Sequence, residues 1–135
     1  MTSQTWLITG SAGYVGSHVV DLFLANNKKI IIYDSLHQGL ESRIEFLRMK
    51  YNVDIPLIVG DIRDTGKFEL ALNTYEPYGV VHTAALKAVG ESMKKPYEYF
   101  EVNFHATSEM LELLKKYKIP LDPHFNSTNR TYISK

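Results

Sequence analysis

Three glycines near the start of the chain have the spacing of a phosphate-binding loop. Gly10, Gly13 and Gly16 form a G-x-x-G-x-x-G motif between an apolar run at residues 6–9 and a stretch with helical spacing. Glycine lets the backbone turn tightly and lets a pyrophosphate lie against it, and a helix that begins there offers unpaired N–H groups to the anion. A tight turn with close helix packing would also explain the glycines, but the flanking strand and helix favour a dinucleotide site.

An acidic residue ends the second apolar run, at Asp34, which is 18 positions after Gly16. A carboxylate in that place can accept hydrogen bonds from both ribose hydroxyls of an adenosine. It would also repel a 2′-phosphate, so Asp34 predicts NAD rather than NADP as the cofactor. The alternative interpretations are a solvated loop aspartate or a helix cap.

Two further groups follow the third and fourth apolar runs. Asp61-Ile62 comes after residues 56–59 and is expected beside the adenine, although a turn aspartate explains it equally well. Thr83-Ala84-Ala85 comes after residues 79–82, at the strand ends where ligands bind in open α/β sheets. Small residues there would let a nucleotide lie against the backbone, and ordinary packing of small residues is the alternative.

Two single polar residues are candidates at the same edge of the sheet. The ammonium group of Lys87 could contact a cofactor ribose or phosphate, and the amide of Asn103 could support the loop after the fourth strand. A surface lysine and a solvated helix position are the alternatives. The five histidines show no paired metal-ligand spacing, so we expect no metal site.

The elements that would position these residues alternate regularly. Short apolar runs predict four buried strands, and helical spacing predicts a helix after each of them. This alternation predicts a Rossmann-type, doubly wound α/β fold with a parallel sheet in the strand order 3-2-1-4. The predicted strands are 6–9, 29–33, 56–59 and 79–82, and the predicted helices are 15–26, 41–51, 65–75 and 96–118.

Two details of the helices can also be predicted. Thr65 is a candidate N-cap for the third helix. Five residues of the fourth helix have the spacing of one common face: Phe100, Phe104, Thr107, Leu111 and Leu114.

Composition excludes several classes of protein. The chain has 135 residues, of which 44% are hydrophobic, and this suits one domain or part of a larger one rather than a disordered chain. Its formal net charge of zero argues against a non-specific nucleic-acid binder. The absence of cysteine excludes disulfides, thiolate metal sites and cysteine nucleophiles and is compatible with a cytoplasmic location. The sequence shows neither the pattern of a signal peptide nor that of a membrane span.

The last part of the chain does not fit the alternating pattern. Residues 119–135 are polar and are interrupted by Pro120 and Pro123, and no further buried strand is visible in them. We therefore predict an incomplete dinucleotide-binding domain at 1–118 and an irregular tail at 119–135. The uncovered edge of the fourth strand would then invite self-association.

Two segments resemble a known family of enzymes. The segment Thr9 to His18 resembles the opening of extended short-chain dehydrogenases/reductases. The run Leu86 to Ser92, Leu-Lys-Ala-Val-Gly-Glu-Ser, with Asn103 after it, resembles the UDP-glucose 4-epimerase family. The resemblance covers residues 5 to about 118, which correspond to the first third of such an enzyme.

The resemblance implies tightly held NAD and assigns a role to each candidate residue. Tyr14 and Val15 would contact the pyrophosphate through their backbone. The adenosine ribose would be surrounded by Asp34, Ser35 and Leu36, and the adenine by Asp61 and Ile62. Two departures from the family pattern are Ser35, where Asn is common, and Thr83-Ala84-Ala85, where Phe-Ala-Gly is common. The remaining cofactor contacts would come from Thr83, Ala84, Ala85, Lys87 and Asn103.

The resemblance also implies a reaction. The family interconverts UDP-glucose and UDP-galactose through a 4-keto intermediate, with a Tyr-x-x-x-Lys pair and a Ser or Thr as the catalytic groups. Tyr132 and Lys135 are three positions apart and follow the long helix too soon, so we predict no catalytic residue in this chain. The intact parent would bind a UDP-hexose in a separate substrate domain and form a homodimer through the long helix.

Three hypotheses for the function follow. The first is the NAD-binding part of a UDP-glucose 4-epimerase, inactive as this fragment. The second is part of another NAD-dependent sugar-nucleotide epimerase or dehydratase. The third is a stand-alone, non-catalytic nucleotide-binding module that acts through a partner.

Overall fold

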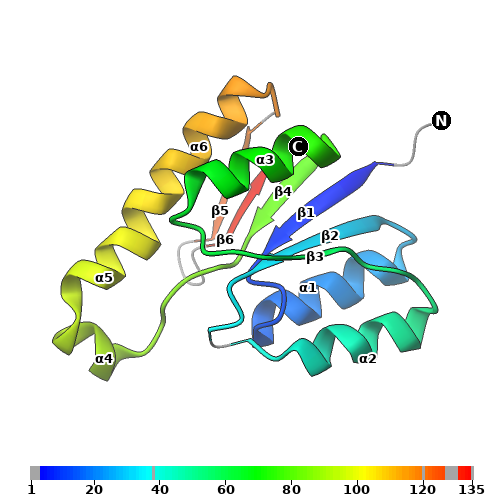
Figure 1. The fold of residues 1–135 in the computed structure, drawn as a ribbon, viewed down its shortest axis with the longest axis horizontal. Helices are drawn as coiled ribbons and strands as arrows, with labels where there is room; N and C mark the ends of the chain where they lie inside the picture. The colour runs from blue at the N-terminus through cyan, green and yellow to red at the C-terminus, as the bar shows by residue number, and fades with distance from the viewer. Residues whose placement is uncertain (1–3, 38, 120, 127–130, 135) are drawn as a thin grey trace.

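The computed structural model describes residues 4–37, 39–119, 121–126 and 131–134. The strands are β1 (Thr5–Thr9), β2 (Lys29–Asp34), β3 (Leu57–Val59), β4 (Gly79–His82), β5 (Leu121–Asn126) and β6 (Thr131–Ser134). The helices are α1 (Tyr14–Ala25), α2 (Glu41–Tyr51), α3 (Thr65–Tyr75), α4 (Val89–Lys94), α5 (Pro96–Phe100), the π-helix η1 (Glu101–His105) and α6 (Ala106–Lys116). Strands and helices alternate through β4, as the sequence predicts (Figure 1).

The sheet has the strand order β3-β2-β1-β4-β6-β5. The first four of these strands are parallel, with Leu7 of β1 between Ile31 of β2 and Val80 of β4. The predicted doubly wound Rossmann fold with the order 3-2-1-4 is therefore confirmed. The carboxyl ends of β1, β2 and β4 come together at one edge, where loops can form a ligand site.

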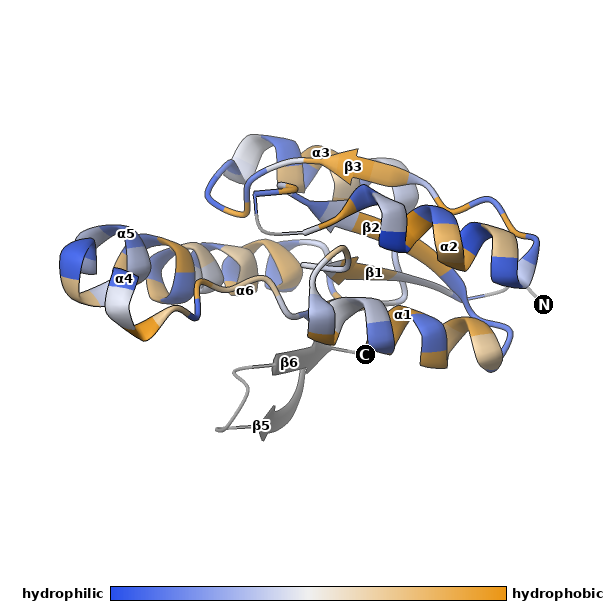
Figure 2. Cartoon of the chain, turned by 90° about the horizontal axis from the view of Figure 1, so that it is seen from below, coloured by the Kyte–Doolittle hydropathy of each residue, from blue (hydrophilic) through white to orange (hydrophobic). Residues whose placement is uncertain are grey.

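Alternate residues of each central strand pack on opposite faces of the sheet. Leu7 belongs to an apolar cluster with residues of α3 and α6, whereas Ile8 belongs to a second cluster with residues of α1 and α2. Both faces are thus covered by helices, and this explains why the strands are apolar throughout. Figure 2 shows these apolar strands enclosed between the two helical layers.

The N-cap of α3 is one residue earlier than predicted. The side chain of Asp64 accepts a hydrogen bond of 3.1 Å from the backbone N–H of Lys67, whereas Thr65 is the first helical residue. A carboxylate so placed satisfies a free N–H of the first turn and complements the helix dipole. Aspartate and threonine are both good caps, so the sequence did not distinguish them.

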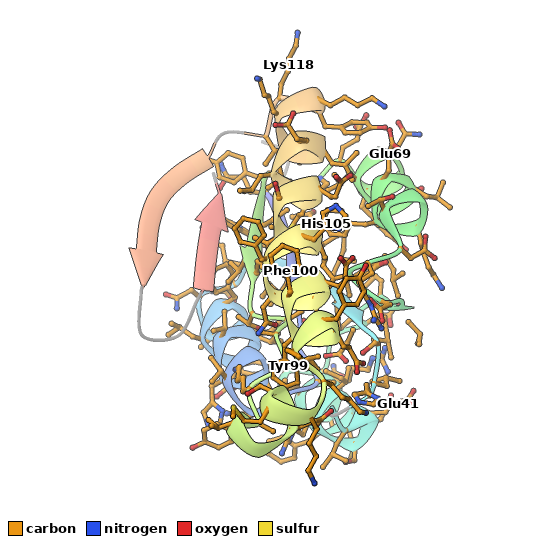
Figure 3. The ribbon with its side chains drawn as sticks, turned by 90° about the vertical axis from the view of Figure 1, so that its left-hand side faces the viewer. Glu41, Glu69, Tyr99, Phe100, His105 and Lys118 are labelled. Atoms are coloured by element: carbon orange, nitrogen blue, oxygen red, sulfur yellow. The ribbon has the colours of Figure 1, made fainter. Side chains whose placement is uncertain are left out.

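The predicted helix at 96–118 contains a π-helical turn, which changes its buried face. Phe100 and Phe104 were expected to share a face with Leu114, but they are 52% and 64% exposed and stack on each other, with ring centroids 5.1 Å apart. Figure 3 shows Phe100 on this helix. Because a π-turn takes up an extra residue, positions before it are rotated relative to those after it. The buried residues of this face are Val102, Ala106, Thr107, Met110 and Leu114.

The segment predicted to be an irregular tail contains two strands. β5 and β6 are antiparallel to each other, and β6 pairs antiparallel with β4, with Val81 opposite Ile133. Unpaired backbone groups along the edge of β4 favour such pairing. The expectation that this edge is uncovered is therefore wrong. The prolines in the sequence argue against a strand at β5, but Pro123 lies on this edge strand, where a missing N–H is tolerated.

Two further expectations concern the Tyr132 and Lys135 pair near the end of the chain and membrane-spanning helices. Tyr132, which we predict not to be catalytic, lies on β6 opposite His82, and Lys135 lies outside the described residues. Within the described ranges, no helix is both long enough and apolar enough to cross a bilayer.

Candidate nucleotide-binding site

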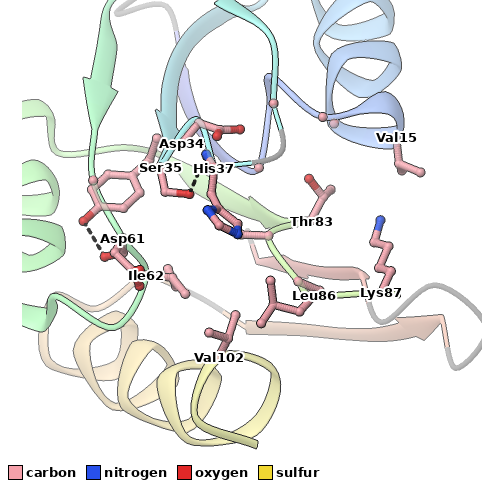
Figure 4. A pocket seen from close by; sticks show the side chains of 18 of the residues that line it. Val15, Asp34, Ser35, His37, Asp61, Ile62, Thr83, Leu86, Lys87 and Val102 are labelled. Carbon is pink, nitrogen blue, oxygen red and sulfur yellow. Dashed lines mark hydrogen bonds between the residues drawn. The ribbon is translucent and has the colours of Figure 1, made fainter. Parts of the chain in front are cut away.

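A cavity of about 750 Å³ lies at the carboxyl edge of the parallel strands (Figure 4). Its walls come from the ends of β1, β2, β3 and β4 and the loops after them, and from the start of α1. Arg43 of α2, Glu98 of α5 and Val102 of η1 complete them. Thirteen of the fifteen predicted site residues line it: Gly10, Gly13, Tyr14, Val15, Gly16, Asp34, Ser35, Asp61, Ile62, Thr83, Ala84, Ala85 and Lys87.

The glycine loop brings backbone segments together more closely than other residues would permit. Gly10 has φ +69°, and a Cβ on it would lie 2.7 Å from the backbone nitrogen of Ala84 in the loop after β4. A Cβ on Gly16 would lie 2.1 Å from the carbonyl oxygen of Gly10. Both contacts are with main-chain atoms that cannot move aside cheaply, so these two positions need glycine.

The start of α1 faces this cavity without a competing side chain. Gly13 is the N-cap and provides no side-chain hydrogen bond, and the first turn has no acidic residue. Tyr14 and Val15, whose N–H groups belong to that turn, line the cavity. A helix start of this kind attracts an anion through its N–H groups and its dipole.

Asp34 connects the two loops that surround it. This residue is only 7% exposed; its Oδ2 accepts a hydrogen bond of 2.8 Å from the N–H of Ala12, whereas Oδ1 accepts one of 2.7 Å from the N–H of Leu36. Each carboxylate oxygen has two lone pairs, so one acceptor position on each is left for a ligand hydroxyl. Leu36 itself does not line the cavity and packs against the apolar cluster under α1 and α2.

Asp61 is held by an arginine two positions later. Nε and Nη2 of Arg63 donate hydrogen bonds of 3.0 and 2.7 Å to the two carboxylate oxygens of Asp61, and the Arg63 N–H donates a third of 2.8 Å. The bonds from Arg63 lower the pKa of Asp61, against the opposing effect of burial. The carboxylate is therefore ionised at neutral pH, with its orientation fixed.

Comparison with known proteins places this architecture in a family. The sequence profile described as GDP-mannose 4,6 dehydratase matches residues 7–132, which is nearly the whole chain. The chain belongs to the GDP-mannose 4,6 dehydratase family.

Relatives of this chain include UDP-glucose 4-epimerases. UDP-glucose 4-epimerase 4 of Oryza sativa subsp. japonica is 40% identical over 116 residues, covering 84% of this chain and 31% of the rice protein. The structure of the Stenotrophomonas maltophila enzyme with bound NAD and formylated UDP-arabinopyranose superposes with a TM-score of 0.82 at 30% identity, over 87% of this chain and 35% of that one. The structure of the Bifidobacterium longum enzyme in complex with NAD⁺ and UDP superposes with a TM-score of 0.81 at 30% identity, over 85% of this chain and 34% of that one. The resemblance to UDP-glucose 4-epimerases is confirmed, and this chain spans about a third of these relatives.

In this family member, a buried hydrogen-bond chain supports the loop after β4. Oγ1 of Thr9 accepts from the N–H groups of Thr83 (3.1 Å) and Ala84 (3.3 Å) and lies 2.6 Å from Nδ1 of His82. Nε2 of His82 lies 3.2 Å from Oγ1 of Thr107, and burial lowers the His82 pKa to about 4. The imidazole is thus neutral at pH 7, and it links β1, β4 and α6 behind the cavity wall.

Asn103 supports the same loop from the π-helix. Its Oδ1 accepts from the Leu86 N–H and its Nδ2 donates to the Leu86 carbonyl, both at 2.8 Å. This agrees with the loop-supporting role considered from the sequence, but Asn103 does not itself line the cavity. Asn103 therefore acts on the site through the position of Leu86, which does line it.

Ten of the lining residues are not among those predicted from the sequence. Gly60 could have been predicted from the sequence, since it directly precedes Asp61. In the structure a Cβ on Gly60 would lie 2.6 Å from the hydroxyl of Tyr33. That hydroxyl donates to the Asp61 carbonyl, and burial raises the Tyr33 pKa. No sequence motif indicated most of the others, because only the folded chain brings their strands, helices and loops to one cavity. The ten are Tyr33, His37, Gly39, Arg43, Val59, Gly60, Arg63, Leu86, Glu98 and Val102.

Proposed function

We propose that this chain is the NAD-binding part of an enzyme that interconverts UDP-glucose and UDP-galactose. One observation carries the proposal: the uncapped first turn of α1 and the carboxylate of Asp34 open into one cavity, at the edge of a doubly wound sheet. An anionic group at the helix start and a ribose at Asp34 are the two features by which such folds bind a dinucleotide.

The residues present suit NAD in size and chemistry. Gly10 and Gly16 allow the tight loop that brings the start of α1 to the cavity, and Lys87 adds a cation to the cavity wall. Asp61 provides an acceptor suited to the exocyclic amine of adenine. When bound, NAD would supply the hydride acceptor for oxidation at C4 of the sugar. The residues of this chain would bind and orient the cofactor, and the proton-transfer groups would come from elsewhere.

Titration calorimetry with the purified chain tests this proposal. We expect NAD to bind, and Asp34→Ala to weaken binding by about tenfold, as expected for loss of hydrogen bonds to a charged group. Asp54→Ala is the matched control, because Asp54 is exposed and does not line the cavity. We expect no turnover of UDP-galactose by the chain alone. A folded chain that releases no heat with NAD would contradict the proposal.

A second candidate is a stand-alone nucleotide-binding module. The pairing of β6 with the edge of β4 supports it, since that edge is then not open to strands from another part of an enzyme. Hydrogen exchange distinguishes the two candidates. Backbone amides of β4 that face β6 should exchange as slowly as those of β1 in a self-contained module, and much faster if the edge is available to another strand.

The exposed apolar surface of α4, α5 and η1 supports the proposal that the whole enzyme is a homodimer. Phe100 and Phe104 form an exposed stacked pair, and Met93 and Tyr97, from the same stretch of the chain, are 81% and 74% exposed. Exposed aromatic groups of this kind are typical of association surfaces. Light scattering before and after Phe104→Lys tests the proposal, and an unchanged monomer in both would contradict it.

A further inference from the structure

The side chain of His37 is the feature of the cavity that the proposed function leaves unused. His37 follows β2 in the loop that leads to α2, and it is exposed. Figure 4 shows its imidazole pointing into the cavity, between the loop of Asp34 and Ser35 on one side and Ile62 on the other. Neither the glycine motif nor the acidic positions indicated a role for this residue.

We propose that His37 is a base-binding residue, whose imidazole stacks on the adenine of a dinucleotide and holds it against Ile62 and Asp61. This inference rests on the proposed function, because it assigns the wall of the same site that receives the base. It adds a residue that the glycine loop and the two aspartates do not supply.

The loop geometry holds His37 in place at this wall. The His37 N–H donates a hydrogen bond of 3.3 Å to Oγ of Ser35, and the preceding residue, Leu36, has φ +60° and donates its own N–H to Asp34. These bonds start the loop in a fixed direction from Asp34. The ribose and the base of an adenosine are covalently joined, so a base attached to a ribose at Asp34 must lie within a few ångströms of this loop.

The opposite wall has the complementary chemistry. Ile62 gives it an apolar side chain, and Arg63 fixes the Asp61 carboxylate as an acceptor for an exocyclic amine. His37 and Asp61 both line this cavity, His37 from the loop after β2 and Asp61 from the loop after β3. An aromatic ring facing an aliphatic side chain, with an acceptor at the edge, is an arrangement suited to a purine.

The imidazole is available for this contact. In the part of the chain that the structure describes, the His37 ring makes no hydrogen bond or ion pair, and only the His37 backbone N–H is bonded, to Ser35. By contrast, His82 is enclosed by Thr9 and Thr107, and His105 pairs with Glu101 and Glu109. His37 is therefore the histidine whose ring can turn a face to a ligand in this cavity.

Calorimetry with NAD and ADP-ribose tests the inference with four proteins. Loss of a stacked ring should make His37→Ala bind both ligands about fivefold or more weakly, whereas His37→Phe should remain within about twofold of the unchanged chain. His105→Ala is the matched control, because His105 is an exposed histidine outside this cavity, and it should bind as the unchanged chain does.

A fluorescence measurement shows stacking directly. The chain's own Trp6 packs edge-on against Phe23 and Tyr78 and does not line the cavity, so its emission should not respond to ADP-ribose. His37→Trp should show emission that ADP-ribose quenches. A purely structural role of His37 would not produce this quenching.

The outcomes separate this inference from the function on which it rests. If the unchanged chain binds NAD and His37→Ala binds it equally well, or His37→Phe loses as much affinity as His37→Ala, the inference is overturned and the proposed function stands. If the unchanged, folded chain binds no NAD, both are overturned. Weak binding by His37→Ala together with retained binding by His37→Phe and quenching in His37→Trp supports the inference.

Discussion

The hydroxyl of Thr9 and the Nδ1 atom of His82 lie 2.6 Å apart in the buried centre of the fold, although 73 positions separate them in the chain. Thr9 already accepts from the N–H of Thr83, so its own proton is directed to His82. Nε2–H of His82 then points to Thr107, and the hydroxyl of Thr107 donates to the Asn103 carbonyl at 3.2 Å. One neutral tautomer therefore satisfies the whole chain of bonds, from β1 to the π-helix.

Stability should fall in mildly acidic solution because of this histidine. Burial lowers the folded-state pKa of His82 from 6.5 to about 4, so between these pH values the unfolded chain binds a proton that the folded chain does not. The free energy of unfolding is therefore independent of His82 above pH 6.5 and falls as the pH drops toward 4. The slope due to this one group is at most about 1.4 kcal/mol per pH unit. Urea unfolding at pH 7.0, 6.0 and 5.0 measures it, with His82→Gln as the reference protein.

Comparison with that variant removes the other titrating groups. The pKa of His105 is raised by Glu101, so His105 contributes in the opposite direction, but it is present in both proteins. The carboxylates with lowered pKa, including Asp21 and Asp61, act mainly below pH 4. Equal pH slopes for the two proteins would contradict a neutral buried His82.

Asp34 should select against a phosphate on the adenosine ribose. Its carboxylate is fixed by Ala12 and Leu36, so it cannot turn away from a 2′-phosphate. We expect NADP to bind at least about tenfold more weakly than NAD, because the 2′-phosphate and the Asp34 carboxylate would repel each other at close distance. Asp34→Ala should bring the two affinities closer together. Competition between the two dinucleotides in equilibrium dialysis measures this, and equal affinities in the unchanged chain would refute it.

Gly10 should be intolerant of even one added carbon. A Cβ at this position meets the backbone nitrogen of Ala84 at 2.7 Å and the φ of +69° is strained for alanine, so Gly10→Ala should cost about 1–3 kcal/mol in the free energy of unfolding. Gly90 is the matched control. It lies in α4, where an added Cβ would meet no atom within 4 Å beyond its chain neighbours and the backbone of its own helix, so Gly90→Ala should be neutral or stabilising by up to about 1 kcal/mol. Similar urea midpoints for the two variants would show that the close approach is not required.

The sequence predicted the elements best where local pattern and fold agree. The bounds of α2 and α3, and the ends of β2 and β4 at Asp34 and His82, follow from apolar spacing that packing then preserves. The π-turn after Phe100 was not predictable, since no local residue type requires it and its effect is a rotation of the helix. Strands β5 and β6 depend on the unpaired edge of β4, a partner far away in the sequence.

The residues of the candidate site also fall into those that local sequence predicts and those that depend on the folded chain. Residues next to a strand end or a glycine, such as Asp34 and Val15, could be predicted because the motif itself positions them. His37, Arg63 and Glu98 could not, because loops after β2 and β3 and helix α5 bring them to the cavity only after folding.

Amide resonances of the glycine loop test the central claim most directly. If a dinucleotide pyrophosphate binds at the start of α1, addition of NAD to the ¹⁵N-labelled chain should shift the Tyr14 and Val15 N–H signals more than those of α2 or α3. Inorganic pyrophosphate should move the same two signals in the same direction. Binding of NAD that leaves Tyr14 and Val15 unchanged would contradict the assignment of this loop.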